Sequence, residues 1–292
     1  MPRTFTRRFR VRYYECDAHR HLSSVYYLRY MQEAAFDASA NVGYDEEEYI
    51  KLGAYWLIRE TEISFNFPLR SNDLVDVITW VDDFRRVRSR RIYEFRLVPT
   101  NELAAKAVTD WVYLDRKTGR PEEIPGEMAA AFSKEGEEIN SKPRARFPKV
   151  NHPPEEAYFV YRKVEWRDID SAQHVNNAVY LAYFEDCGNQ VSEEYGWEMK
   201  QMQDIGIGIA ARKHHILYQQ PALLDDKLEI ATWLTDIQNS TMNRHYVIKR
   251  LRDNEILGKS NSVYELIDLN SGKPTNFPGS FRQDFKANTK SD

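Results

Sequence analysis

The chain of 292 residues has only two cysteines, Cys16 and Cys187. So few cysteines exclude a disulfide framework and are typical of proteins in a reducing compartment, so we expect a cytoplasmic protein. No apolar run approaches the roughly 18 residues that a membrane-spanning helix needs, so we expect no membrane association. Residues 1–8 carry charge but lack the apolar segment of a secretory signal peptide.

The sequence also lacks the patterns that bind nucleic acids, nucleotides and metals. Its net charge of −4 at pH 7 disfavours nucleic acid as a partner. It has no glycine-rich phosphate loop. The seven histidines are scattered, and the adjacent His214 and His215 have no carboxylate or cysteine at ligand spacing. We therefore predict neither a metal nor another cofactor.

The sequence does contain an internal repeat with a constant offset. Asp170 lies 170 − 17 = 153 residues after Asp17. The same offset joins His21–His174, Tyr27–Tyr180, Tyr30–Tyr183, Gly43–Gly196, Arg59–Arg212, Pro68–Pro221, Asp73–Asp226, Trp80–Trp233, Tyr93–Tyr246, Gly119–Gly272 and Pro125–Pro278. Chance would not hold one register at Gly, Pro and Trp over this length, so the chain contains two copies of one domain.

We expect the first domain at residues 1–132 and the second at residues 158–292. Between them, residues 133–157 have the composition of a linker. They contain Lys-Glu-Gly-Glu-Glu, Ser-Lys-Pro-Arg and His-Pro-Pro-Glu-Glu, with few apolar side chains.

Each copy predicts one long helix and several strands. In the first copy, Ser23 or Ser24 can cap a helix that runs to Ala40, and a short helix at residues 45–52 ends before Gly53. In the second copy, Asn176 or Asn177 can cap the long helix. Alternating apolar and charged residues predict strands in the first copy at residues 9–14, 56–67, 74–81, 88–99 and 104–115. This order predicts an α+β domain, a curled antiparallel sheet wrapped round a central helix.

The turn before each long helix has an aspartate and, four residues later, a histidine. The second copy reads Trp166-Arg-Asp-Ile-Asp170-Ser-Ala-Gln-His174-Val-Asn-Asn-Ala-Val-Tyr180. This stretch resembles the signature of the acyl-acyl carrier protein (acyl-ACP) thioesterases, and the resemblance covers nearly the whole chain. It implies a tandem hotdog fold. The first copy, Tyr14-Glu-Cys-Asp17, also resembles the single-domain acyl-CoA thioesterases.

The chemistry of a thioester fits this turn. Thiols have a pKa near ~8.5, so the thiolate leaves with little acid assistance. A carboxylate can attack the carbonyl or activate water, and unpaired N–H groups at a helix N-terminus can stabilise the oxyanion. By resemblance, Asp170 is the acid or base and His174 is its partner, with Asp17 and His21 as their counterparts. We favour the second copy as the active one because its signature is fuller.

The sequence departs from the family pattern in two places. Where the family usually has asparagine two residues after the aspartate, this chain has Ala172. Where the family tends to have a glutamate, it has Gln219, Gln220 and Pro221. Both departures favour a mechanism in which the aspartate acts directly.

Each of these residues also has a structural interpretation. The aspartates can cap the turn, and the histidines can be structural. Asn176 and Asn177 can cap the helix or bind substrate. We expect Cys16 and Cys187 to be packing residues.

A run of arginines occurs in the first copy only. Residues 84–92 contain Arg85, Arg86, Arg88, Arg90 and Arg91, whereas the equivalent stretch of the second copy contains one arginine. We predict that Arg86, Arg88 and Arg90 contact the phosphopantetheine phosphate or the acidic surface of an acyl carrier protein. The alternative is a strand edge protected by charge.

Three functions compete. The first is hydrolysis of fatty acyl thioesters, carrier-bound in preference to CoA-bound, by a monomer or a homodimer. The second is hotdog hydratase activity, which the resemblance disfavours because that family places histidine five residues after the aspartate, beside Asn-Pro. The third is a non-catalytic acyl-thioester-binding module, which would not need the Asp-His pair that both copies contain.

Overall fold

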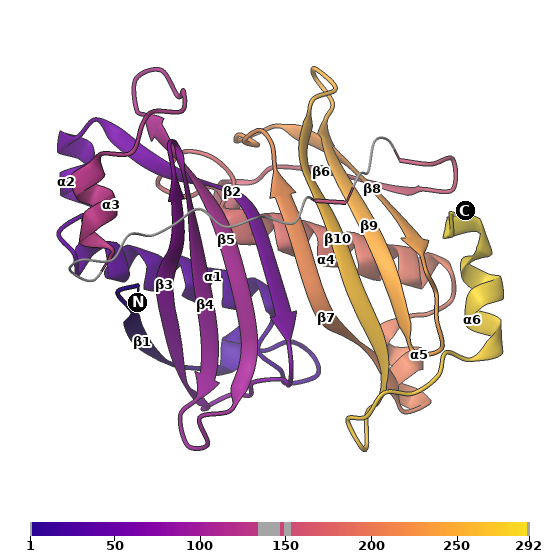
Figure 1. Ribbon diagram of the computed structural model, residues 1–292. Coiled ribbons are helices and arrows are strands. Elements are labelled where there is room, and N and C mark those ends of the chain that lie inside the picture. Colours follow the sequence, from indigo (N-terminus) through magenta and orange to yellow (C-terminus); the bar gives the residue numbers. More distant parts are fainter. Residues whose placement is uncertain (1, 134–146, 149–152, 291–292) are drawn as a thin grey trace. The chain divides into compact units, whose positions relative to one another are not determined.

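The computed structural model describes residues 2–133, 147–148 and 153–290. The chain divides into two compact units, residues 1–146 and 147–292 (Figure 1). Most of the predicted linker, residues 133–157, lies outside the described residues. Within the described part of the chain, no helix combines the length and the apolar character needed to cross a membrane.

Among its described residues, the first unit contains five strands and three helices. In chain order they are β1 (Phe5–Arg10), α1 (Ser24–Ala40), α2 (Glu46–Lys51), β2 (Ala54–Phe65), β3 (Leu74–Arg85), β4 (Arg88–Leu97), β5 (Leu103–Asp115) and α3 (Gly126–Ala131). A single 3₁₀ turn, η1 (Tyr13–Glu15), follows β1.

The second unit repeats this order. Its elements are β6 (Tyr158–Lys163), η2 (Trp166–Asp168), α4 (Asn177–Glu194), α5 (Met199–Asp204), β7 (Ile207–Tyr218), β8 (Lys227–Thr235), β9 (Thr241–Arg250), β10 (Ile256–Asp268), α6 (Gly279–Asp284) and η3 (Phe285–Asn288).

Each unit is an antiparallel sheet packed on one long helix, as the sequence predicts. The strand order is β1-β3-β4-β5-β2 in the first unit and β6-β8-β9-β10-β7 in the second. Bulges interrupt the register between Ile58 and Glu60 and between Val263 and Tyr264, and bulges increase the twist of a sheet. In Figure 1, α1 passes behind β3, β4 and β5, and α4 passes behind β7, β10 and β9. The ring of Tyr27 in α1 packs against the rings of Phe65 and Phe95, with a distance of 5.0 Å between ring centroids in each pair.

The first strand differs from the prediction. We expected residues 9–14, but β1 ends at Arg10 and residues 13–15 form the 3₁₀ turn. The cause is a local hydrogen bond, because the Arg12 backbone N–H donates to Glu15 Oε2 at 2.7 Å. The aromatic residues that suggested a strand point into solvent, and the Tyr13 side chain is 86% exposed.

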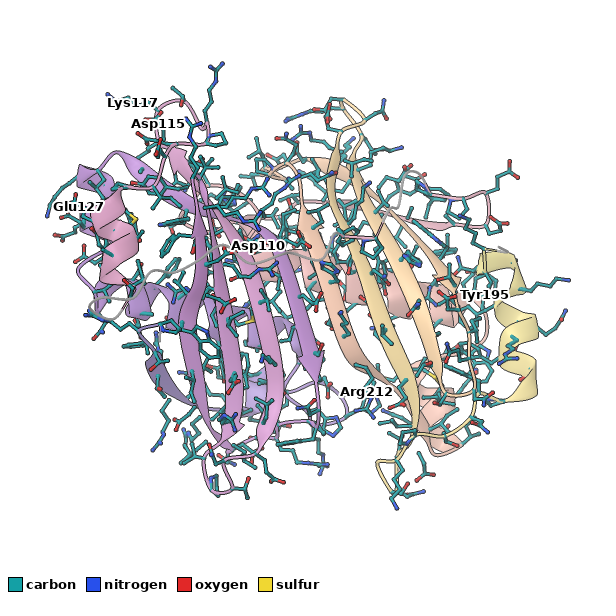
Figure 2. All side chains as sticks on the ribbon, in the orientation of Figure 1. Asp110, Asp115, Lys117, Glu127, Tyr195 and Arg212 are labelled. Carbon is teal, nitrogen blue, oxygen red and sulfur yellow. The ribbon has the colours of Figure 1, made fainter. Side chains whose placement is uncertain are left out.

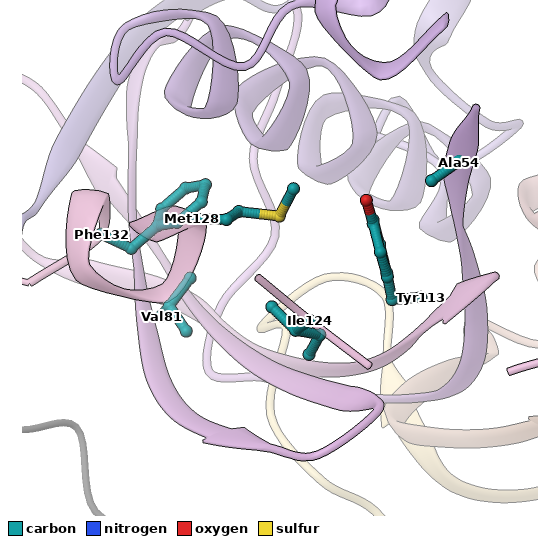
Figure 3. Close-up of a cluster of buried hydrophobic side chains, with 6 residues drawn as sticks. All are labelled: Ala54, Val81, Tyr113, Ile124, Met128 and Phe132. Carbon is teal, nitrogen blue, oxygen red and sulfur yellow. The ribbon is translucent and has the colours of Figure 1, made fainter. Parts of the chain in front are cut away.

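A short helix closes one end of the first sheet. Met128 of α3 is fully buried, with Phe132 beside it, in a cluster that comprises Ala54, Val81, Tyr113, Ile124, Met128 and Phe132 (Figure 3). In the second unit, Phe281 and Phe285 occupy the corresponding cluster with Trp197, Met202, Leu234 and Met242. The sequence did not predict these terminal helices, because each is only six residues long.

A buried arginine under the terminal segment is common to both units. Arg91 Nη1 donates to Thr79 Oγ1 at 3.5 Å, and its guanidinium lies 5.4 Å from the Phe132 ring centroid. The residues 153 positions later repeat this arrangement. There Arg244 Nη1 donates to Thr232 Oγ1 at 3.4 Å, with the Phe285 ring 5.6 Å away. One arginine of the predicted run is therefore a core residue.

His214 is the most deeply buried titratable residue of β7. Its Nδ1 lies 2.9 Å from Ser262 Oγ, and burial lowers the pKa of His214 to about 3. Glu185 Oε1 lies 3.9 Å from the other ring nitrogen, beyond hydrogen-bond distance. Burial therefore outweighs the attraction of that carboxylate, and the imidazole is neutral at neutral pH.

This burial predicts a pH-dependent stability. Below the unfolded-state pKa of about 6.5, the unfolded chain binds a proton that folded His214 cannot bind, so stability falls as the pH decreases. When the pH falls from 6.5 to 5, the unfolding free energy of the wild type should decrease by about 2 kcal/mol more than that of a His214→Gln variant. Urea denaturation across this range measures the difference. Parallel curves for the two proteins would contradict the assignment.

Candidate active site

The turn at Asp170 is closed by its own backbone. The Asp170 N–H donates to the His174 carbonyl at 3.1 Å, and the Gln173 N–H donates to the Asp170 carbonyl at 2.9 Å. Gln173 has a φ of 63°, in the left-handed region that closes tight turns. Asp170 Oδ1 accepts the Ala172 N–H at 2.9 Å, which fixes the carboxylate.

The turn at Asp17 has the same construction. The Asp17 N–H donates to the His21 carbonyl at 2.8 Å, and Arg20 has a φ of 63°. Asp17 Oδ1 accepts two backbone N–H groups, from His19 at 2.8 Å and from His21 at 3.0 Å. Both copies therefore present an aspartate on a rigid turn.

A buried carboxylate anchors each turn to the long helix. Asp168 Oδ2 accepts the Tyr183 hydroxyl at 2.7 Å and the Glu165 N–H at 2.8 Å. The Asp168 carbonyl accepts the N–H of Asn176, the residue that caps α4, at 3.0 Å. Asp168 therefore holds both ends of the segment that contains Asp170.

The first unit uses a longer acid in the same way. Glu15 Oε2 accepts the Tyr30 hydroxyl at 2.5 Å, and the Glu15 carbonyl accepts the Ser23 N–H at 3.0 Å. Burial first, and then the carboxylate, raise the pKa values of Tyr30 and Tyr183. Sequence reasoning missed the two carboxylates, although the offset that pairs Tyr30 with Tyr183 also pairs Glu15 with Asp168.

The two asparagines have different contacts. Asn176 Oδ1 accepts the Ala178 N–H at 3.0 Å, so Asn176 caps α4. Its Nδ2 donates to Asp170 Oδ2 at 3.0 Å. Asn177 begins the helix, and its carbonyl accepts the Tyr218 hydroxyl at 3.1 Å. The side-chain amide of Asn176 therefore contacts Asp170, a contact that the methyl side chain of Ala172 cannot make.

The histidines lie beside their aspartates. His174 Nδ1 is 3.9 Å from Asp170 Oδ1, and the two side chains are 17% and 23% exposed. In the first unit, burial lowers the pKa of His21; Asp17 opposes this shift and Arg70 adds to it. The acid, the imidazole and a helix N-terminus therefore meet at each turn.

The segment that lacks the family's glutamate has a structural role. The Gln220 carbonyl accepts the Tyr180 hydroxyl at 3.3 Å, and that hydroxyl accepts the Ala222 N–H at 2.9 Å. The Val175 N–H also donates to the Ala222 carbonyl, at 2.9 Å. The segment thus holds the far side of the turn through its backbone.

The predicted arginines occupy different environments. Arg90 Nε lies 3.0 Å from Asp110 Oδ1, and the two side chains are 19% and 8% exposed (Asp110 is labelled in Figure 2). Arg86 pairs at 3.5 Å with Glu123, and both of these side chains are largely exposed. Arg88 is exposed on β4. Of the three, Arg86 and Arg88 can reach a ligand in solvent without breaking a buried ion pair.

Neither cysteine resembles a nucleophile, and both are free. Cys187 is buried, and burial raises the pKa of its thiol to about 12. Burial and then Asp17 raise the pKa of Cys16. Among the residues that the structure describes, no group of three histidines, cysteines or carboxylates could hold a metal ion.

Comparison with known families identifies both units. Residues 2–132 match the acyl-ACP thioesterase N-terminal domain, and residues 164–285 match the thioesterase-like superfamily. The chain is therefore similar to acyl-ACP thioesterases in its first unit and to the wider thioesterase-like superfamily in its second. Its turns at Asp17 and Asp170 fall inside these two matches.

Similar proteins include plant enzymes whose names describe them as chloroplastic. An acyl-[acyl-carrier-protein] hydrolase of Cuphea viscosissima is 26% identical over 189 residues, covering 61% of this chain and 46% of the relative. A dodecanoyl-[acyl-carrier-protein] hydrolase of Umbellularia californica is 26% identical over 202 residues, covering 65% and 53%. The chain thus spans about half the length of these relatives.

Solved structures of the acyl-ACP thioesterase family share the fold. The 12:0-ACP thioesterase from Umbellularia californica has a TM-score of 0.72 at 20% identity, covering 90% of this chain and 97% of that one. An acyl-ACP thioesterase from Bacteroides thetaiotaomicron has a TM-score of 0.69 at 16% identity, covering 90% and 98%. The predicted tandem hotdog fold is therefore confirmed.

Proposed function

We propose that this chain hydrolyses fatty acyl-ACP thioesters to free fatty acid and holo-carrier protein. The observation that carries the proposal is the turn that places Asp170 and His174 beside the N-terminus of α4, in a chain whose first unit matches the acyl-ACP thioesterase N-terminal domain. The names of the relatives favour a carrier-bound acyl group. Hydrolysis of acyl-CoA is the second candidate, because Tyr14-Glu-Cys-Asp17 resembles acyl-CoA thioesterases.

In this proposal, Asp170 attacks the thioester carbonyl or activates the water that attacks it. Ala172 N–H and Asn176 Nδ2 each donate to one oxygen of the carboxylate, so it meets the substrate in a fixed orientation. Each carboxylate oxygen has a second lone pair for the reaction. His174 acts as the partner of Asp170. Asp17 and His21 are the corresponding pair of the first unit.

The oxyanion needs donors near this carboxylate. The N-terminus of α4 supplies backbone N–H groups and the positive end of the helix dipole. The Asn176 side chain takes the Ala178 N–H, so we assign the oxyanion contact to the N–H of Asn177. One such donor typically lowers the barrier by about 2.7–4 kcal/mol. In this assignment Asn176 positions Asp170, and the Asn177 backbone contacts the substrate.

The proposed setting follows from the cysteines and the substrate. The unpaired Cys16 and Cys187 fit a reducing compartment, and we retain the cytoplasm as the expected one. The two plant relatives carry chloroplastic names.

Replacing the aspartates tests the catalytic assignment. Asp170→Asn should lower kcat at least about 100-fold, because the amide can neither attack nor accept the proton of water. Asp17→Asn should retain most of kcat if the second unit performs the reaction. The measurement is thiol release from acyl-ACP and acyl-CoA thioesters of several chain lengths. If both variants kept wild-type kcat, the assignment would be wrong; a wild type that released no thiol would favour the binding module.

Replacing the exposed arginines tests the predicted phosphate contact. Arg86→Ala/Arg88→Ala should raise KM for carrier-bound substrate severalfold with little change in kcat, because charge-assisted contacts to phosphate are lost. Arg90→Ala is measured separately because it leaves the buried Asp110 carboxylate without its ion-pair partner. The unfolding free energy of this variant is compared with that of the wild type. An unchanged KM in both variants would exclude the contact.

A further inference from the structure

Five exposed arginines lie on the segments that form or flank the Asp17 turn of the first unit. We name this set the arginine rim, and it consists of Arg10, Arg12, Arg20, Arg29 and Arg70. It is distinct from the arginine run at residues 85–91, which extends from the end of β3 into β4.

The members of the rim come from four segments that meet at the turn. Arg10 ends β1, and Arg12 precedes η1. Arg20 is the left-handed residue of the turn itself. Arg70 forms a backbone bridge with His21. Arg29 lies in the second turn of α1, with its guanidinium 4.9 Å from the Tyr26 ring centroid.

Two tyrosines extend the rim into solvent. Tyr13 is 86% exposed and Tyr14 is 66% exposed, so burial explains the position of neither ring. The Arg12 guanidinium lies 6.0 Å from the Tyr14 ring centroid. Tyrosine and arginine are enriched among the residues that dominate protein interfaces.

The arginines of the rim outnumber the carboxylates at the turn. Within the described part of the chain, Arg12 is the one member with a carboxylate at ion-pair distance, that of Glu15. Glu15 is buried and also holds Tyr30. Asp17 and Asp73, which accept backbone N–H groups of the turn and of the neighbouring loop, add two carboxylates, so five arginines lie near three carboxylates. The surface around the turn is therefore basic.

The second unit shows that the fold does not require these charges. The residues 153 positions after the rim are Lys163, Glu165, Gln173, Ala182 and Leu223. Only one of them is a cation, yet the Asp170 turn has the same backbone hydrogen bonds as the Asp17 turn. The rim is therefore a property of the first unit alone.

We propose that the arginine rim is the docking surface for the acyl carrier protein, a small acidic protein. The inference rests on the proposed function and identifies the surface that recognises the substrate's protein part. A rim that spans a strand end, a turn, a loop and a helix is larger than one phosphate group. Its positive charge complements an acidic protein surface, and complementary charges accelerate association.

The test combines three substitutions at exposed positions, Arg20→Gln, Arg29→Ala and Arg70→Gln. The first two install the residues of the second unit. KM for acyl-ACP should rise about tenfold with kcat unchanged, because the lost charges steer association. Hydrolysis of the same acyl group on N-acetylcysteamine, which has no carrier, should change less than about twofold. Added NaCl should raise KM more in the wild type than in the variant.

A matched control removes the same charge at the other end of the sheet. The control variant combines Arg116→Gln, Lys117→Gln and Arg120→Gln. These residues lie in the exposed turn after β5, which follows the pairing of Asp115 with Ala54 at the start of β2 (Asp115 and Lys117 are labelled in Figure 2). This control should keep the wild-type KM. A rim variant with unchanged KM, or a control with the same rise, would overturn the proposal.

Failure of the proposed function would look different. If the wild type hydrolysed no thioester, the proposed function would be wrong, and docking would then be judged from binding of holo-carrier by calorimetry. Tighter binding to the wild type than to the rim variant would support the docking surface. No binding to the wild type, or binding only to vesicles of anionic lipid, would overturn it.

Discussion

In each unit a buried carboxylate accepts a hydrogen bond from a tyrosine of the long helix, and this contact anchors the turn that contains the aspartate and the histidine. Glu15 binds Tyr30 at 2.5 Å, and Asp168 binds Tyr183 at 2.7 Å. A buried carboxylate without partners is costly, so the pair is stable only when both are in place. Because the same acid also binds the helix cap through its carbonyl, it fixes where the turn starts and where the helix begins.

The two copies share this frame and differ in what surrounds it. In the second unit, Asn176 caps the helix and binds Asp170, whereas the corresponding cap of the first unit, Ser23, makes no side-chain capping bond. The first unit instead carries the arginine rim. The duplicated fold thus has its fuller catalytic signature in one copy and its basic surface in the other, which accounts for a chain with two similar turns and one proposed reaction.

The sequence predicted the repeat, the long helices and the two Asp-His turns, because constant spacing and helical periodicity are local signals. It failed where a contact depends on strand register or on the geometry of individual side chains. The pairing of Arg90 with Asp110 and the burial of Arg91 depend on strand register, which a run of arginines does not reveal. The end of β1 was misjudged because exposed Tyr13 and its neighbour resemble strand residues. The role of Asn176 required its distance to Asp170.

The most direct test of this account removes one hydroxyl from the buried pair. Tyr183→Phe keeps the ring and deletes the bond to Asp168, and Tyr30→Phe deletes the equivalent bond of the first unit. If the second unit's turn performs hydrolysis, Tyr183→Phe should lower kcat on acyl-ACP about tenfold with KM little changed, which corresponds to about 1.4 kcal/mol of lost transition-state stabilisation. Tyr30→Phe should lower the unfolding free energy by an amount similar to that for Tyr183→Phe, but it should retain the wild-type kcat. Equal kcat values for Tyr183→Phe and the wild type would contradict the account.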